Sequence, residues 1–117
     1  MPSHVSNLVE ETSTTTGTGN LTTSSVNGRV TFSTAYSTGS TTNVFYYFIA
    51  NESAAEWEIG LGHMSASTTL VRDTVMLSSN SNAAVNFSAG TKRICNDFPA
   101  DRQISIGAAA SLPYATP

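Results

Sequence analysis

Two carboxylates separated by one residue, Glu56 and Glu58, come nearest to acid–base chemistry in this 117-residue chain. Such a pair serves catalysis when its surroundings drive the two pKa values apart. Residues i and i+2 of a strand share a face, and here they flank Trp57. We therefore expect Trp57 and Ile59 to face the core and both glutamates to face water. No nucleophile or metal ligand adjoins the pair in the sequence, which favours a solvated face over a catalytic pair.

The remaining reactive side chains are isolated from one another. A catalytic triad needs a histidine beside a serine or cysteine and an acid, and a zinc site needs more ligands at regular spacing. A phosphate-binding loop requires a helix that begins directly after it. The sequence predicts no helix after the glycine pairs at 17–20 and 60–63. We predict no catalytic residue, metal or cofactor, and we expect the scattered candidates His4, His63 and Cys95 to be structural.

Composition narrows the class of protein. Charged residues make up 11% of the chain and the net charge is −3, against a typical charged share of about 25%. Only Lys92-Arg93 places two cations together, so the sequence disfavours nucleic-acid binding. No segment has the length and apolarity of a membrane span, and residues 1–4 do not resemble a signal peptide. One cysteine permits no intrachain disulfide, which favours maturation in a reducing cytoplasm.

Short runs of Thr, Val, Ile and aromatic residues alternate with Gly, Asn and Ser clusters, the pattern of an all-β protein. No segment keeps a helical period over three turns. Asn27-Gly28 is a hairpin signal. Arg72-Asp73 suggests a local kink or a bulge that divides two strands. We predict one β-sandwich or compact, jelly-roll-like barrel over residues 8–100, between a loose N-terminal arm (1–7) and an extended C-terminal arm (101–117). The expected strands are 8–12, 21–23, 29–36, 44–50, 55–61, 68–77, 83–87 and 91–96.

The segment 44–50 is apolar on both faces, so both faces need a cover. Either two layers of the domain supply it, or one face meets another subunit. Trp57 and one of Tyr46 and Tyr47 are expected inside, although aromatics including Tyr36 would also suit a sugar-binding platform. The predicted core residues are Phe32, Trp57, Ile59, Val75 and Phe87. The predicted subunit or capsid contacts are Val9, Phe45, Tyr47, Ile104 and Ile106.

Several sequence blocks in combination resemble a small β-module of tailed-bacteriophage virion proteins. They are Glu56-Trp57-Glu58-Ile59-Gly60, Arg72-Asp73-Thr74-Val75 and Asn86-Phe87-Ser88-Ala89-Gly90-Thr91-Lys92, within a likeness that runs from about Val9 to Ala100. Such modules occur as small proteins and near the start of longer tail-fibre proteins. The resemblance implies a structural virion component without enzymatic activity, and it names no catalytic residue.

Within that class we expect a capsid decoration (cement) protein, assembled in the bacterial cytoplasm, that forms a homotrimer and bridges major capsid proteins. Symmetric assembly would reuse one patch on each copy, and terminal arms would add contact area on the lattice. Two alternatives stay open. One is a tail or tail-fibre adaptor that binds another virion protein, and the other is a carbohydrate-binding adhesion domain on the virion surface.

Overall fold

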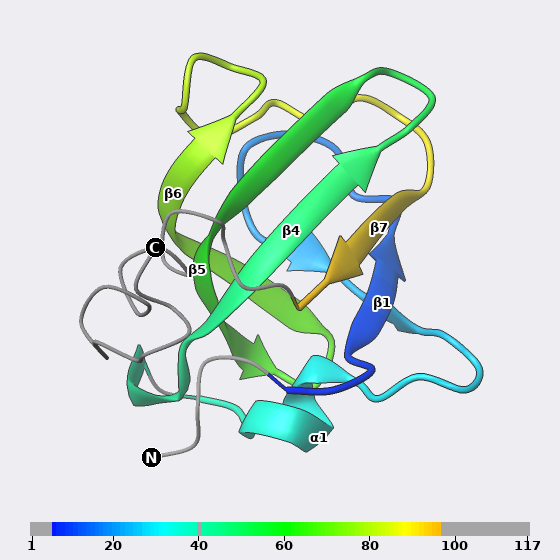
Figure 1. The fold of residues 1–117 in the computed structure, drawn as a ribbon, viewed down its shortest axis with the longest axis vertical. Coiled ribbons are helices and arrows are strands. Elements are labelled where there is room, and N and C mark those ends of the chain that lie inside the picture. Colours follow the sequence, from blue (N-terminus) through cyan, green and yellow to red (C-terminus); the bar gives the residue numbers. More distant parts are fainter. Residues whose placement is uncertain (1–5, 40, 97–117) are drawn as a thin grey trace, which may run out of the picture.

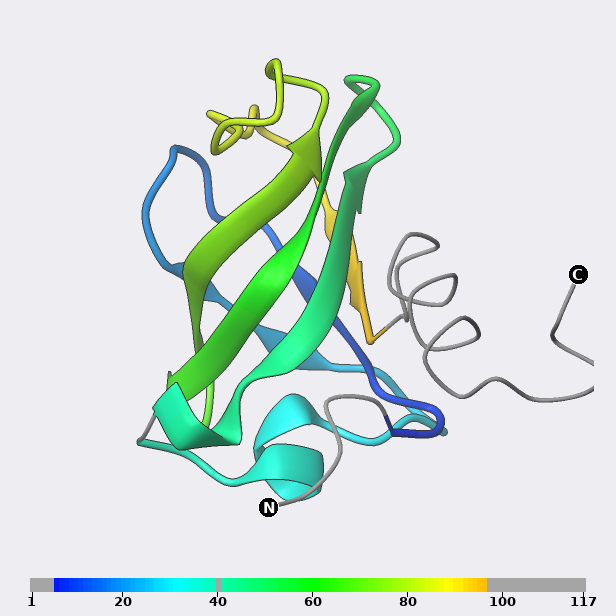
Figure 2. The same ribbon diagram turned by 60° about the vertical axis from the view of Figure 1, so that its left-hand side comes forward.

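The computed structural model describes residues 6–39 and 41–96, which form one sheet of seven antiparallel strands nearly closed into a barrel (Figures 1 and 2). This confirms the all-β prediction and selects the barrel over the sandwich. Around the barrel the strand order is β2-β6-β5-β4-β7-β1-β3. The strands are β1 (Glu10–Ser13), β2 (Leu21–Thr22), β3 (Ser24–Ser25), β4 (Phe45–Asn51), β5 (Glu56–Ala66), β6 (Thr69–Ser78) and β7 (Lys92–Cys95).

The two edge strands of this sheet are consecutive in the chain. Only Thr23 separates β2, which pairs with β6, from β3, which pairs with β1. The backbone N–H of Thr23 donates to the carbonyl of Thr68 at 2.8 Å. One short segment thus bridges both edges, which leaves little free edge for pairing with another sheet.

The structure shows which of the two apolar faces of β4 points into the barrel. Phe45, Tyr47 and Ile49 are fully buried, whereas the alternate residues Tyr46 and Phe48 are only partly covered and face outward. The interior side chains meet α1 (Phe32–Tyr36), which lies across one end of the barrel (Figures 1 and 2).

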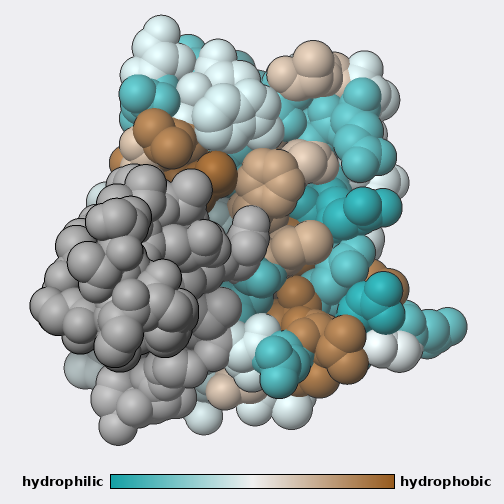
Figure 3. Space-filling view, viewed as in Figure 1, coloured by the Kyte–Doolittle hydropathy of each residue, from teal (hydrophilic) through white to brown (hydrophobic). Residues whose placement is uncertain are grey.

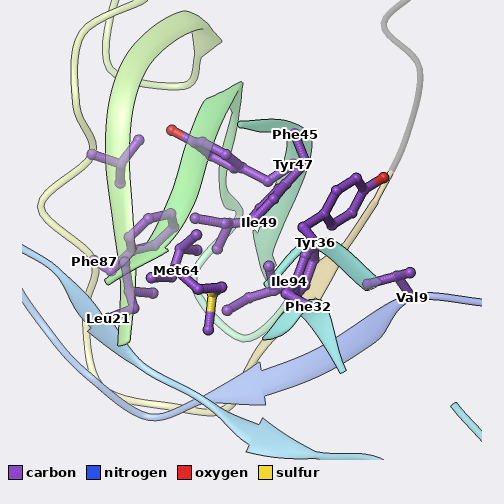
Figure 4. Close-up of a cluster of buried hydrophobic side chains, with 12 residues drawn as sticks. Val9, Leu21, Phe32, Tyr36, Phe45, Tyr47, Ile49, Met64, Phe87 and Ile94 are labelled. Atoms are coloured by element: carbon purple, nitrogen blue, oxygen red, sulfur yellow. The ribbon is translucent and has the colours of Figure 1, made fainter. Parts of the chain in front are cut away.

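The core is one cluster of buried side chains from β2, α1, β4, β5, β6 and β7 and from the segments next to them (Figure 4). The Phe32 ring stacks on Phe45 with centroids 4.5 Å apart, and Tyr36 lies 4.9 Å from Phe45. Phe32 and Phe87 are core residues as predicted. The cluster consists of Val9, Leu21, Phe32, Tyr36, Phe45, Tyr47, Ile49, Met64, Leu70, Val85, Phe87 and Ile94.

The strand predicted over 29–36 is wrong, because its second half is the helix α1. Thr31 caps this helix by accepting a hydrogen bond from the Thr34 N–H at 3.2 Å. Phe32 and Tyr36 are spaced by four residues, so one helical face buries both. Val30 instead forms a parallel bridge to Val9, and a 3₁₀ turn, η1 (Thr41–Asn43), follows.

The predicted orientation of β5 is also wrong. Glu58 and Gly60 point into the barrel, whereas Trp57 is 36% exposed and Ile59 is only partly buried. Gly60 pairs with Tyr47. A Cβ at Gly60 would lie 2.7 Å from the Tyr47 hydroxyl, so the large β4 side chain requires a glycine opposite it.

The remaining predictions of side-chain position are either wrong or concern residues outside the described part of the chain. Val75 is partly buried instead of central. Val9, Phe45 and Tyr47, predicted as contacts, lie in the chain's own core and present no surface to a partner. Ile104 and Ile106, with the arms 1–5 and 97–117, lie outside the described residues.

Two local predictions concern β6 and the loop after it. A bulge lies at the expected place, because Leu61 pairs with Thr74 and Gly62 with Arg72, which leaves Asp73 unpaired in the ladder. It does not divide two strands, since β6 continues through it. The strand expected over 83–87 forms only isolated bridges, from Ala83 to Asn80 and from Phe87 to Gly17.

Candidate functional site

The two carboxylates that the sequence drew attention to lie on the inner side of β5, and each accepts hydrogen bonds from other residues of the barrel and its loops. Glu58 is fully buried. It accepts hydrogen bonds from the Tyr47 hydroxyl at 2.6 Å, the Val85 N–H at 2.9 Å and the Arg72 guanidinium at 2.8 Å. Burial, followed by this contact with Glu58, raises the pKa of Tyr47.

Arg72 forms an ion pair with the buried Glu58 and connects loops that are far apart in the sequence. Its guanidinium also donates to the carbonyls of Gly17, Gly19 and Val85 at 2.9 to 3.2 Å. It lies 5.3 Å from the centroid of the Phe87 ring. A buried ion pair needs such extra hydrogen bonds to offset its desolvation. The pair therefore holds two loops to the barrel.

Glu56 has a comparable role at the end of β5. It accepts from the Ser88 N–H at 2.9 Å, the Ser88 hydroxyl at 2.7 Å and the Asn51 amide at 3.1 Å. These bonds, that of the Ser88 N–H first, hold the pKa of Glu56 below its usual value. Lys92 nearby is fully buried and donates to the carbonyls of Ser88 and Gly90, and burial lowers its pKa.

The other predicted site residues do not converge. His63 contacts Asp73 across β5 and β6, Nδ1 to Oδ2 at 2.7 Å, and His4 lies outside the described residues. Cys95 lies on the outer side of β7, beside Phe48. Among residues 6–39 and 41–96, no three His, Cys, Asp or Glu side chains gather in a way that suits a metal ion.

The feature that sequence reasoning missed is an apolar surface on the outside of β4, β5 and β6. Trp57 and Leu77 are 36% and 40% exposed. Ile59 pairs with both Leu77 and Phe48, so the apolar side chains adjoin across three strands. We call the set Tyr46, Phe48, Ala50, Trp57, Ile59, Leu61, Leu77 and Cys95 the outer apolar face.

Hydrophobic residues gather over these strands in the space-filling view (Figure 3). A shallow hollow of about 580 Å³ adjoins the face, lined by Phe48, Ala50, Asn51, Glu52, Ala55, Glu56 and Trp57. At its border Arg93 reaches Glu10 at 3.3 Å and Glu52 at 3.8 Å. An apolar centre with a charged rim is the usual anatomy of a protein contact surface.

One signal in the sequence points toward this surface without locating it. The glycines at 60 and 62 alternate with Ile59 and Leu61, and glycines inside a strand mark a close approach of other atoms. That signal assigns Gly60 and Gly62 to the crowded interior and therefore places Trp57 outside.

Comparison with known proteins adds no relative. No family model, no curated protein and no solved structure matches this chain. Within the described residues, no helix has the length and apolarity needed to span a membrane.

Proposed function

We propose that this chain is a non-enzymatic structural protein of a bacteriophage virion, a capsid decoration protein that contacts its partners through the outer apolar face. The phage assignment rests on the sequence resemblance. The observation that supports a contact role is the exposure of Trp57 and Leu77 next to Phe48 on one side of the barrel. Large apolar side chains gathered on one surface typically mark an interaction site.

The chemistry of the barrel agrees with a structural role. The carboxylates Glu56 and Glu58 each accept three hydrogen bonds, and the donors Val85 and Ser88 belong to the loop between β6 and β7. A homotrimer that bridges major capsid proteins would repeat the outer apolar face at each subunit, so weak single contacts would add up over the lattice. A tail or tail-fibre adaptor would use the same surface in fewer copies.

A capsid-binding experiment tests this proposal. Purified wild-type chain and the variant Phe48→Ser/Trp57→Ser are added to capsids that lack the protein, and bound copies per capsid are counted. We expect the wild type to saturate the capsids and the double variant to lose most of its occupancy. Leu8→Ser is the matched control, because Leu8 is 65% exposed but lies outside the face. Equal occupancy of both variants would contradict the proposal.

Carbohydrate binding is the second candidate, and one observation favours it. The exposed Trp57 borders a hollow that also carries the exposed carboxylate of Glu52. An aromatic surface beside polar groups is a common arrangement for sugar stacking. A glycan array with the wild type and Trp57→Ala tests it: binding lost in the variant supports a sugar site, and no signal on the array eliminates it.

A further inference from the structure

The outer apolar face contains both of the chain's single-copy reporter residues. Trp57 is the only tryptophan and Cys95 the only cysteine. Cys95 on β7 pairs with Phe48 on β4, and Phe48 pairs with Ile59 on β5, two residues from Trp57. The two side chains therefore sample opposite parts of one surface.

The chain leaves the barrel at a fixed point beside this face. Asn96 follows β7, and its N–H donates to the Val9 carbonyl at 3.1 Å. Its side-chain oxygen accepts from the Tyr36 hydroxyl at 2.8 Å, and its amide donates to the Tyr46 carbonyl at 2.5 Å. Tyr46 belongs to the outer apolar face, so the residues after Asn96 start next to that face.

The sequence that follows is suited to an apolar surface. Its charged residues are Asp97, Asp101 and Arg102, and residues 103–117 carry no charge. Apolar side chains recur in that uncharged part, at Ile104, Ile106, Leu112 and Tyr114.

The segment is also long enough to cross the face. From β7 to β6 is three strand spacings, on the order of 14 Å at about 4.8 Å each. Ile104 lies eight residues beyond Asn96, a reach of about 26 Å when extended at roughly 3.3 Å per residue.

We propose that residues 103–117 cover the outer apolar face of their own chain before assembly. A second copy could supply the same segment, but a tether that starts beside the face gives an effective concentration in the millimolar range, far above that of a dilute protein. The proposal deepens the proposed function, on which it rests for the purpose of the face: the segment must leave the face before a partner binds there.

The test reads Trp57 and Cys95 in the full chain. The wild type is compared with Ile104→Ser/Ile106→Ser, using tryptophan emission, acrylamide quenching and the rate of thiol modification by a disulfide reagent. We expect the double variant to show longer-wavelength emission, stronger quenching and faster thiol modification. Ala108→Ser/Ala109→Ser is the matched control, and we expect it to behave as the wild type.

Two results would overturn the proposal. One is identical emission, quenching and thiol rates in the wild type, Ile104→Ser/Ile106→Ser and a second variant, Leu112→Ser/Tyr114→Ser. The other is protection of Trp57 and Cys95 that disappears on dilution, which would assign the cover to a second copy. Circular dichroism confirms that each variant is folded. The measurement needs no capsid, so its failure is distinct from failure of the proposed function.

Discussion

How deeply a side chain is buried in this barrel depends on whether it points to the inner or the outer side of the sheet. Phe45 and Trp57 are both large aromatics on neighbouring strands, yet Phe45 is fully buried between Phe32 and Tyr36, and Trp57 is 36% exposed. Truncation of a buried aromatic loses its packing and leaves a cavity, whereas truncation at the surface loses only part of the buried area.

This difference makes a direct prediction for stability. Phe45→Ala should lower the free energy of unfolding by about 3–5 kcal/mol. Trp57→Ala should lower it by less, about 1–2 kcal/mol, because 36% of Trp57 is exposed in the structure and its removal leaves no enclosed cavity. Urea denaturation of both variants measures the two values. A larger loss for Trp57→Ala than for Phe45→Ala would place the tryptophan back in the core.

Tyrosine ionisation makes stability depend on alkaline pH. Burial raises the pKa of Tyr36 from 10.0 to about 12, and its hydrogen bond to Asn96 opposes part of that shift. A raised folded-state pKa means that the folded chain holds its proton where the unfolded chain loses it. The stabilisation from Tyr36 is complete below pH 10 and is lost as the pH rises from 10 toward 12.

We therefore expect the free energy of unfolding of the wild type to fall steeply above pH 10. Tyr36→Phe should show a shallower fall, because phenylalanine has no proton to lose, and Tyr47 should account for the remainder through its own raised pKa. Urea denaturation at a series of alkaline pH values compares the two proteins. Equal slopes would mean that the Tyr36 hydroxyl is not protected by the fold.

At the scale of elements, the pairing of β4 with β5 sets the orientation of both strands. Tyr47 of β4 lies opposite Gly60, and Phe45 lies opposite Gly62. Both glycines leave room for the Tyr47 ring, which approaches the Cβ positions of Gly60 and Gly62, and the bulge at Asp73 lies in β6 on the other side of β5. The strand period of two then places Trp57 and Ile59 outside.

Substitution of Gly60 tests this packing. A Cβ there would collide with the Thr74 carbonyl and lie 2.7 Å from the Tyr47 hydroxyl. We expect Gly60→Ala to destabilise the barrel by about 1–3 kcal/mol or more, as overpacking does. Gly19→Ala is the matched control, since no atom lies within 4 Å of its Cβ position and its φ is not in the left-handed region. Thermal unfolding compares them, and equal melting temperatures would contradict the packing account.

Local sequence patterns predicted much of the fold. Segments 44–50, 68–77 and 91–96 are close to β4, β6 and β7, because apolar runs and turn residues mark strands locally. The apolar alternation of β5 predicted the wrong orientation. Gly60 and Gly62 carry the opposing signal, but the Tyr47 ring that requires Gly60 belongs to another strand. The helix at 32–36 was missed because one turn is too short to establish a period.

The candidate site depended even more on tertiary structure. The carboxylates of Glu56 and Glu58 attracted attention as a pair, but Arg72 and Ser88 occupy them from segments far along the chain. The apolar character of both faces of 44–50 indicated that one of them needs a cover, without showing that it is the face that carries Phe48. Its neighbours in the outer apolar face become evident once cross-strand register is known.

At the scale of the whole molecule, the barrel separates two kinds of surface. Its interior is closed by α1 and by the bridging segment Leu21–Ser25, and its charged pair Glu58–Arg72 is satisfied inside. The outer apolar face is the surface through which we propose that the chain contacts its partners. A small, nearly closed barrel with one apolar side is compatible with the proposed role, in which each copy on a symmetric shell makes the same contacts.

The most direct test of the proposed capsid role is the number of copies of the chain per particle in purified virions, measured by quantitative mass spectrometry against the major capsid protein. The account predicts a ratio near one, or a simple fraction that symmetry repeats over the shell. A few copies per particle would instead assign the chain to the tail or a vertex. Absence from the virion would contradict the structural role.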